Sequence, residues 1–113
     1  MKAKIIGVII GIVFLTCATA VAVQNQGAKN IALDSDKKTE VNFPHHLHQD
    51  TIGNCNVCHD LFPKTAGIIK ILKEQKKLKK KQVMNKTCIK CHKAKRNAGE
   101  KSGPIRCSNC HVK

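Results

Sequence analysis

The pattern of hydrophobic and polar positions changes several times along the chain. Residues 5–23 form a mostly apolar run that contains no charged residue and ends in small residues. Further on, the short runs Ile31-Ala32-Leu33 and Val41-Asn42-Phe43 flank a charged segment at residues 34–38. Short β-prone runs on either side of a polar turn are typical of a β-hairpin, so we predict one here. Pro44 then ends the second strand and could begin a helical turn.

The most regular pattern lies in residues 67–83, where hydrophobic side chains return every three or four positions. This spacing predicts an amphipathic helix, with an apolar stripe formed by Ile68, Ile71, Leu72 and Leu78. The opposite face would be rich in lysine, with Lys70, Lys73, Lys76, Lys77, Lys80 and Lys81. Residues 93–104 are polar and contain glycine, and we expect them to form a loop.

The apolar run at the start has the features of a secretory signal peptide. The basic stretch Met1-Lys2-Ala3-Lys4 precedes it, and small residues in an A-x-A pattern occupy residues 18–22. We therefore expect a signal peptide at residues 1–22, its removal, and a mature domain over residues 23–113. An uncleaved membrane anchor is the alternative, because the run approaches the roughly 20 residues that cross a bilayer.

Composition changes the interpretation of the remaining 91 residues. They carry a net charge of +12, and Val, Ile, Leu and Phe make up about 21% of them. That fraction is close to the level below which a highly charged chain tends to be disordered. Such a polypeptide cannot bury a large core made only of its own side chains. We therefore expect a non-protein group to fill the interior.

The cysteines indicate which group this is. Seven are present, and Cys17 lies in the expected signal peptide. The other six form three C-x-x-C-H motifs, which are Cys55-Asn56-Val57-Cys58-His59, Cys88-Ile89-Lys90-Cys91-His92 and Cys107-Ser108-Asn109-Cys110-His111. This motif attaches haem c. The two thiols add to the vinyl groups, and the histidine binds the iron. The sequence therefore predicts three covalently bound haems c.

Other uses of paired cysteines explain this pattern less well. Zinc sites combine C-x-x-C pairs in twos, or with a histidine pair, and three pairs leave one over. A redox-active C-x-x-C usually occurs once, in a βαβ pattern that this sequence lacks. A disulfide framework suits a short secreted chain, so a cationic, disulfide-linked binding protein stays an alternative. None of these uses accounts for a histidine after each pair.

Three haem irons have six axial positions, and the motif histidines would fill half of them. His45 and His48 are three residues apart, so they share one face of a helical turn and could each reach a different haem. His46 projects about 100° away, and we expect it to be a solvent-exposed histidine. Met84 is the candidate for the sixth position, because a thioether binds haem iron. His46, a water molecule or an open iron are the alternatives, and a lone methionine can also be core filler.

The order of these features resembles the triheme cytochromes c7, short relatives of the tetrahaem cytochromes c3 within the class III cytochromes c. The likeness rests on the hairpin, on Phe43-Pro44-His45-x-x-His48, on Cys55 seven residues later, and on two further C-x-x-C-H motifs. It implies a small multihaem cytochrome c fold, mostly loops and short helices around three haems. Such a fold has a short N-terminal β-hairpin and little other regular secondary structure.

We predict one pair of axial ligands for each haem. The pairs are His45 with His59 for the first, His48 with His92 for the second, and Met84 with His111 for the third. In the resembled family, the third distal ligand is a histidine four residues before the second motif, and Met84 stands at that position. The stretch between the first two motifs also departs from the family, because it is longer and richer in lysine.

Irons closed on both sides cannot bind a substrate, so the expected function is one-electron transfer rather than catalysis. The resemblance implies a periplasmic carrier in anaerobic respiration of metals or sulfur compounds. Its partners would be a membrane quinol-oxidising cytochrome on one side and periplasmic or outer-membrane cytochromes on the other. A small haem reductase that uses an open third iron is the alternative function.

The charge bears on the partners. Lys70, Lys73, Lys77 and Lys80 would form a docking face on the predicted helix and attract acidic redox proteins. Nucleic acid is not an expected partner, because the chain is secreted and has no tyrosine or tryptophan for base stacking. We expect the protein to be a monomer.

Overall fold

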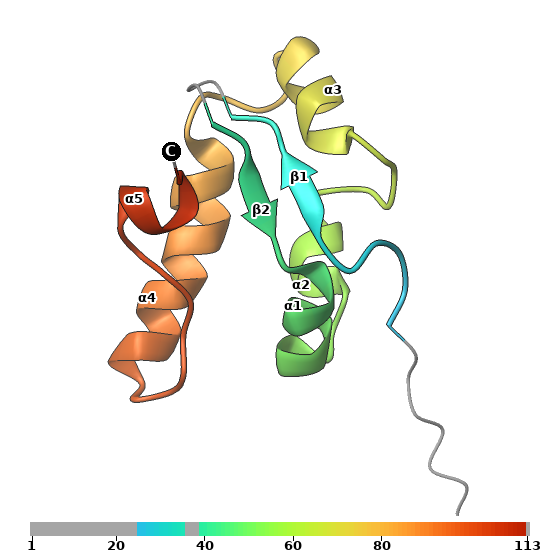
Figure 1. Ribbon diagram of the computed structural model, residues 1–113. Coiled ribbons are helices and arrows are strands. Elements are labelled where there is room, and N and C mark those ends of the chain that lie inside the picture. Colours follow the sequence, from blue (N-terminus) through green and yellow to red (C-terminus); the bar gives the residue numbers. More distant parts are fainter. Residues whose placement is uncertain (1–24, 36–38, 113) are drawn as a thin grey trace, which may run out of the picture.

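The structure is a computed structural model, and it describes residues 25–35 and 39–112. The expected signal peptide and the tip of the hairpin turn lie outside these residues. The elements in chain order are β1 (Ile31–Leu33), β2 (Val41–Phe43), α1 (His45–Ile52), α2 (Asn56–His59), α3 (Ile68–Glu74), the π-helical segment η1 (Met84–Cys88), α4 (Ile89–Asn97) and α5 (Cys107–Cys110) (Figure 1). Short helices, loops and one two-stranded sheet are the expected fold class. No helix in the described part of the chain is long and apolar enough to cross a membrane.

The predicted hairpin is confirmed. β1 and β2 pair antiparallel, with Ile31 opposite Phe43 and Leu33 opposite Val41. These four residues are partly buried, whereas Ala32 and Asn42 between them are exposed, so one face of the hairpin points inward. Helix α1 begins two residues after β2, which places its histidines beside this inward face.

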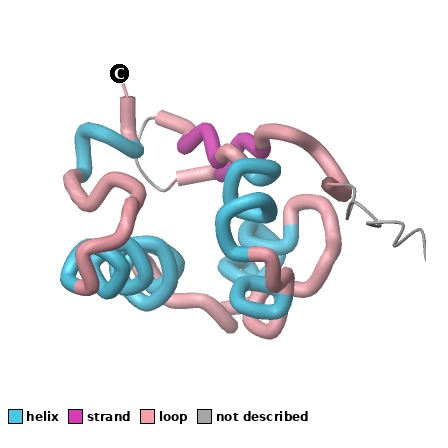
Figure 2. The backbone as a smooth tube through the Cα atoms, turned by 90° about the horizontal axis from the view of Figure 1, so that it is seen from below, coloured by secondary structure: helices cyan, strands magenta, loops and turns pink. Residues whose placement is uncertain are grey.

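The elements form two groups that stand opposite each other (Figure 1). Helices α1 and α2 lie together at one end of the hairpin, and α4 and α5 form the other side of the molecule. Figure 2, seen from below, shows the same separation. The three C-x-x-C-H motifs are located at α2, at the junction of η1 with α4, and at α5. One motif therefore lies in the group of α1 and α2, and the other two lie in the group of α4 and α5.

The protein part of the core is small. Among the described residues, the buried hydrophobic side chains are Phe62 and Leu78, which are 8% and 5% exposed. Leu47, Val57 and Val112 are each more than half exposed. Few side chains are thus covered by other side chains, as the low content of large hydrophobic residues predicts.

The helix predicted over residues 67–83 is interrupted, and this prediction is wrong for residues 75–81. Residues 82–83 are helical again and lead into η1. After α3, Lys76 adopts a left-handed conformation with φ of 56°. The Lys77 N–H then donates to the Leu72 carbonyl at 2.8 Å, which is the helix-ending pattern known as a Schellman motif. The reversal brings Leu78 back into a buried position. Burial of this leucine outweighs the local preference for helix, and no glycine or proline marked the stop.

The loop predicted over residues 93–104 is partly helical. Helix α4 continues to Asn97, and Gly99 ends it with φ of 75°. The Glu100 N–H donates to the Lys95 carbonyl at 2.9 Å, and the two side chains form an ion pair at 2.6 Å. The loop itself begins after this ending. The polar residues counted as loop are the solvent-facing side of an exposed helix.

We expect Lys76→Gly to stabilise the holoprotein by about 0.5–1 kcal/mol, because glycine adopts the left-handed conformation without a steric penalty. Chemical denaturation followed by circular dichroism would measure the change. Lys77→Gly is the matched control, since its φ is not positive. It should be neutral or destabilising. Equal effects of the two substitutions would contradict the explanation.

Candidate haem-binding site

The thiols of the three motifs lie close enough to influence one another. Burial raises the pKa of Cys58, and the charge of Cys91 raises it further. Burial also raises the pKa of Cys88, with smaller contributions from Cys110 and Cys58. Charges act in this way only over short distances. The six motif cysteines are free thiols, so all are available for thioether bonds.

Two pairs of imidazoles that each include a motif histidine lie at the separation that one metal ion requires. The ring centroids of His45 and His59 are 6.2 Å apart, and those of His48 and His92 are also 6.2 Å apart. Metal–imidazole bonds are about 2.0–2.1 Å long, so two imidazoles on opposite sides of one metal place their ring centres roughly 6 Å apart. Each pair joins a histidine from α1 to a histidine of a C-x-x-C-H motif. The ring centroids of His45 and His46 are also 6.2 Å apart, but both residues belong to α1 and neither belongs to a C-x-x-C-H motif.

Main-chain carbonyls fix the tautomer of all four rings. Each ring donates its Nδ1–H to one carbonyl, and the bonds are His45 to Ala28 at 3.2 Å, His48 to Pro44 at 2.9 Å, His59 to Phe62 at 2.7 Å and His92 to Pro104 at 2.7 Å. A ring that carries its proton on Nδ1 has the lone pair on Nε2. These contacts orient metal-binding imidazoles and increase their basicity. The residues present therefore fit two haem irons.

His46 is arranged differently. It is partly buried rather than solvent-exposed as expected. Its Nε2–H donates to the Gly27 carbonyl at 3.0 Å. In the other four rings this atom carries the lone pair, and in His45 it lies 3.4 Å from the Gln49 amide nitrogen. In His46 it carries a proton that is donated to the backbone.

The second imidazole pair is packed against two residues that the sequence reasoning did not single out as supports. The ring centroids of Phe43 and His48 are 4.4 Å apart. On the other side, Gly103 lies against His92, and a Cβ atom there would be 2.4 Å from its Cε1. The Gly-Pro pair just before the third motif was the available signal for this contact, because glycine often marks a close approach of the backbone.

The third site has different surroundings. Met84 is partly buried in η1, four residues before Cys88. Residues four apart in a helix share a face, so the methionine and the second motif's first cysteine emerge on the same side. His111 follows α5, and its Nδ1 is buried with no hydrogen-bond partner among the described residues. It thus lacks the carbonyl contact that the other four rings have.

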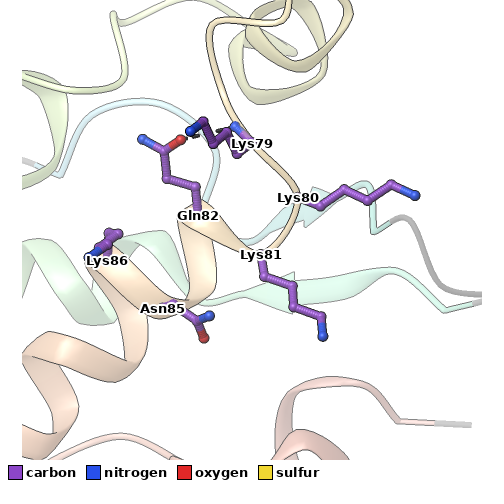
Figure 3. A pocket seen from close by; sticks show the side chains of 6 residues that line it. All are labelled: Lys79, Lys80, Lys81, Gln82, Asn85 and Lys86. Atoms are coloured by element: carbon purple, nitrogen blue, oxygen red, sulfur yellow. Dashed lines mark hydrogen bonds between the residues drawn. The ribbon is translucent and has the colours of Figure 1, made fainter.

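The lysines predicted to form a docking face do not lie on a single helix. Because α3 ends at Glu74, Lys70, Lys73, Lys77 and Lys80 do not share one helix. Lys73 also donates to the Asp34 carbonyl at 3.4 Å. Figure 3 shows instead an open hollow at the turn before η1, lined by Lys79, Lys80, Lys81, Gln82, Asn85 and Lys86. No acidic residue occurs in the sequence between Glu74 and Glu100.

Paired imidazoles, convergent thiols and a small protein core are typical of a small multihaem cytochrome c. Residues 18–111 match the class III cytochrome C family. A cytochrome c7 from Geobacter metallireducens is 36% identical over 78 residues, which are 68% of this chain and 69% of that protein. The triheme cytochrome PpcA from Geobacter sulfurreducens has a TM-score of 0.53 and 31% identity, over 76% of this chain and 100% of PpcA. PpcC, a cytochrome c7 from the same organism, has a TM-score of 0.53 and 29% identity, over 76% and 99%.

The chain belongs to the class III cytochrome c family and is a triheme cytochrome c7. Its cofactors are three c-type haems, and it is an electron carrier of this family. The predicted family, fold class and cofactor are confirmed.

Proposed function

We propose that the protein is a periplasmic carrier that passes electrons between respiratory redox partners in anaerobic respiration. The observation that carries this proposal is the pair of 6.2 Å imidazole contacts, in which all four rings donate Nδ1–H to a main-chain carbonyl and so carry the lone pair on Nε2. Iron held between two such ligands exchanges single electrons and has no open position for a substrate. The apolar run at the start of the sequence supports export.

The protein's own contribution is attachment and orientation. The six motif cysteines form the thioethers, and the ligand pairs are His45 with His59 and His48 with His92. Carbonyls of Ala28, Pro44, Phe62 and Pro104 hold these imidazoles in one tautomer. Because both distal histidines lie on the one short helix α1, two of the cofactors must be close neighbours.

For the third iron, we propose His111 and Met84 as ligands. Two observations support this choice. Burial raises the pKa of Cys88, and the charge of Cys110 in the third motif raises it further. Cys88 in turn lies one helical turn from Met84. His46 is a weaker candidate, since its Nε2–H is engaged with Gly27.

Mass spectrometry of the purified mature protein tests this proposal directly. Three covalent haems should be found, and a Cys→Ala change in any motif should remove one of them.

The spin state of the haems tests the ligand pairs. His48→Ala should convert one haem from low spin to high spin, because it loses an axial ligand. His46→Ala should leave all three haems low spin. A folded, haem-free protein, or a low-spin spectrum unchanged in His48→Ala, would overturn the proposal.

We also propose that acidic partners dock at the lysine hollow rather than along α3. Three lysines of this hollow precede η1, and the fourth, Lys86, belongs to η1, which also carries Met84. A partner held there would be close to the third iron. Complementary charge increases the rate of encounter.

We expect the rate of oxidation by ferricyanide, a small anion, to fall severalfold between 0.01 and 0.1 M salt, because the screening length shortens from about 30 Å to about 10 Å. Stopped-flow absorbance would measure it. Lys80→Gln with Lys86→Gln should weaken this salt dependence. Lys64→Gln with Lys101→Gln removes the same charge outside the hollow and is the control. If both double variants behave alike, only net charge matters and the hollow has no special role.

A further inference from the structure

A short segment before the hairpin is tied to helix α1 by a series of contacts. We call residues 26–29 the N-terminal strap. The His46 N–H donates to the Lys29 carbonyl at 3.2 Å, and the His46 Nε2–H donates to the Gly27 carbonyl at 3.0 Å. Between these two anchors, the Ala28 carbonyl accepts the Nδ1–H of His45 at 3.2 Å. His46 thus binds the carbonyls of both neighbours of Ala28, whose own carbonyl accepts from His45.

The start of the strap is fastened separately. The Gln49 side chain binds both main-chain groups of Gln26, donating to its carbonyl at 2.8 Å and accepting from its N–H at 3.2 Å. Gln49 is one helical turn beyond His45, and its amide nitrogen lies 3.4 Å from the His45 Nε2. Gly27 completes the turn with φ of 74°, and a Cβ atom added there would lie 3.5 Å from the Cε1 of His45. The strap therefore meets α1 on the side that carries His45.

We propose that the N-terminal strap, held by His46 and Gln49, is a clamp that positions the His45 imidazole and thereby sets the potential of the first haem. In this arrangement His46 is a positioning residue and not an axial ligand. The inference rests on the proposed function, because it takes His45 as the distal ligand of the haem attached at Cys55 and Cys58.

The physical reason is the hydrogen bond at Nδ1. A carbonyl that accepts the Nδ1–H makes the imidazole a stronger donor to the metal and fixes the ring plane. A stronger donor favours the ferric state. Release of the strap would weaken the contact with Ala28, so the first haem should become easier to reduce. The other imidazole pair is held by Pro44 and Pro104, which do not belong to the strap, so its haem should be unaffected.

The holoprotein variant His46→Ala tests the clamp. At a fixed solution potential, the ferrous-to-ferric ratio of the first haem should rise roughly two- to tenfold, the effect of one hydrogen bond. Redox titration followed by NMR separates the three haems, and the methyl shifts of the first haem report the orientation of its axial imidazoles. Both signals should change for the first haem alone.

Three further variants separate the proposed clamp from a general effect of mutation on helix α1. His46→Gln retains a side-chain N–H and should restore most of the wild-type behaviour. Gln49→Ala releases the other end of the strap and should act in the same direction, with less than additive effects in the double variant because both changes free the same segment. Thr51→Ala is the control on the same helix, since its hydroxyl donates to the Leu47 carbonyl at 2.7 Å and not to the strap.

Each other result has a definite meaning. If His46→Ala and Gln49→Ala match Thr51→Ala in potentials and methyl shifts, the strap only packs against α1 and the clamp is refuted. If His46→Ala makes one haem high spin, His46 is itself a ligand and the clamp is again refuted. A wild-type protein that lacks three covalent haems would instead overturn the proposed function, which separates the two failures.

Discussion

Met84→His should bring the reduction potential of the third haem down toward those of the other two. In the wild type, the far-red charge-transfer band of a ferric iron–thioether bond should be present, and the substitution should remove it. Thioether in place of imidazole raises the potential of a haem. The buried His111 Nδ1 acts in the same direction, because it has no acceptor among the described residues to increase the ring's basicity. The wild-type third haem should therefore be reduced first.

Redox titration with visible absorption and NMR would measure these changes, including the strongly shifted methyl resonance of a bound methionine. Asn85→Ala is the matched control, because it changes the next residue of the same π-helical segment. It should leave the band in place. If the wild type lacks both signals and readily binds carbon monoxide, its third iron is open. The alternative of a small haem reductase would then gain support.

Gly103→Ala should disrupt the second haem more severely than any change that removes only a hydrogen bond. The added Cβ would lie 2.4 Å from the Cε1 and 2.5 Å from the Nε2 of His92, far inside the contact distance of about 3.5 Å. Either the ring or the loop must move. We expect partial loss of the low-spin signal at one haem and a destabilisation of about 1–3 kcal/mol, as is typical of overpacking.

Electron paramagnetic resonance and chemical denaturation would detect these two effects. The backbone of Gly103 does not have a positive φ, so an alanine there tests the collision and not backbone strain. Ser102→Ala, at the exposed neighbouring position, should be close to neutral. A Gly103→Ala protein with wild-type spin state and stability would show that His92 is not confined by this loop.

The chemistry of the site could be predicted from local sequence because each haem motif is itself local. Two thiols and a histidine within five residues define an attachment site whatever the surrounding fold. The spacing of His45 and His48 also limits which histidines can share a helical face. The low content of large hydrophobic side chains also predicted that a non-protein group fills the interior. The small buried core is consistent with this prediction.

The boundaries of the helices depended on contacts that the local sequence does not contain. Lysine-rich residues 75–83 favour helix by propensity, but burial of Leu78 turned the chain back through a left-handed Lys76. The four lysines of the predicted face therefore do not share one helix, and one of them, Lys80, lines the hollow at the start of η1 instead. In α4, the opposite error arose because a polar helix on the surface looks like a loop when its apolar face is small.

The sequence alone determined the number and kind of cofactors, since these follow from covalent chemistry within short motifs. Only the tertiary structure decided which side chains support the ligands. The acceptors at Ala28 and Pro104 are main-chain carbonyls, which every residue has and which therefore leave no mark in a sequence. Their positions depend on how the strap and the loop before the third motif pack against histidines 17 and 12 residues away. Such contacts between distant parts of the chain exist only once it has folded.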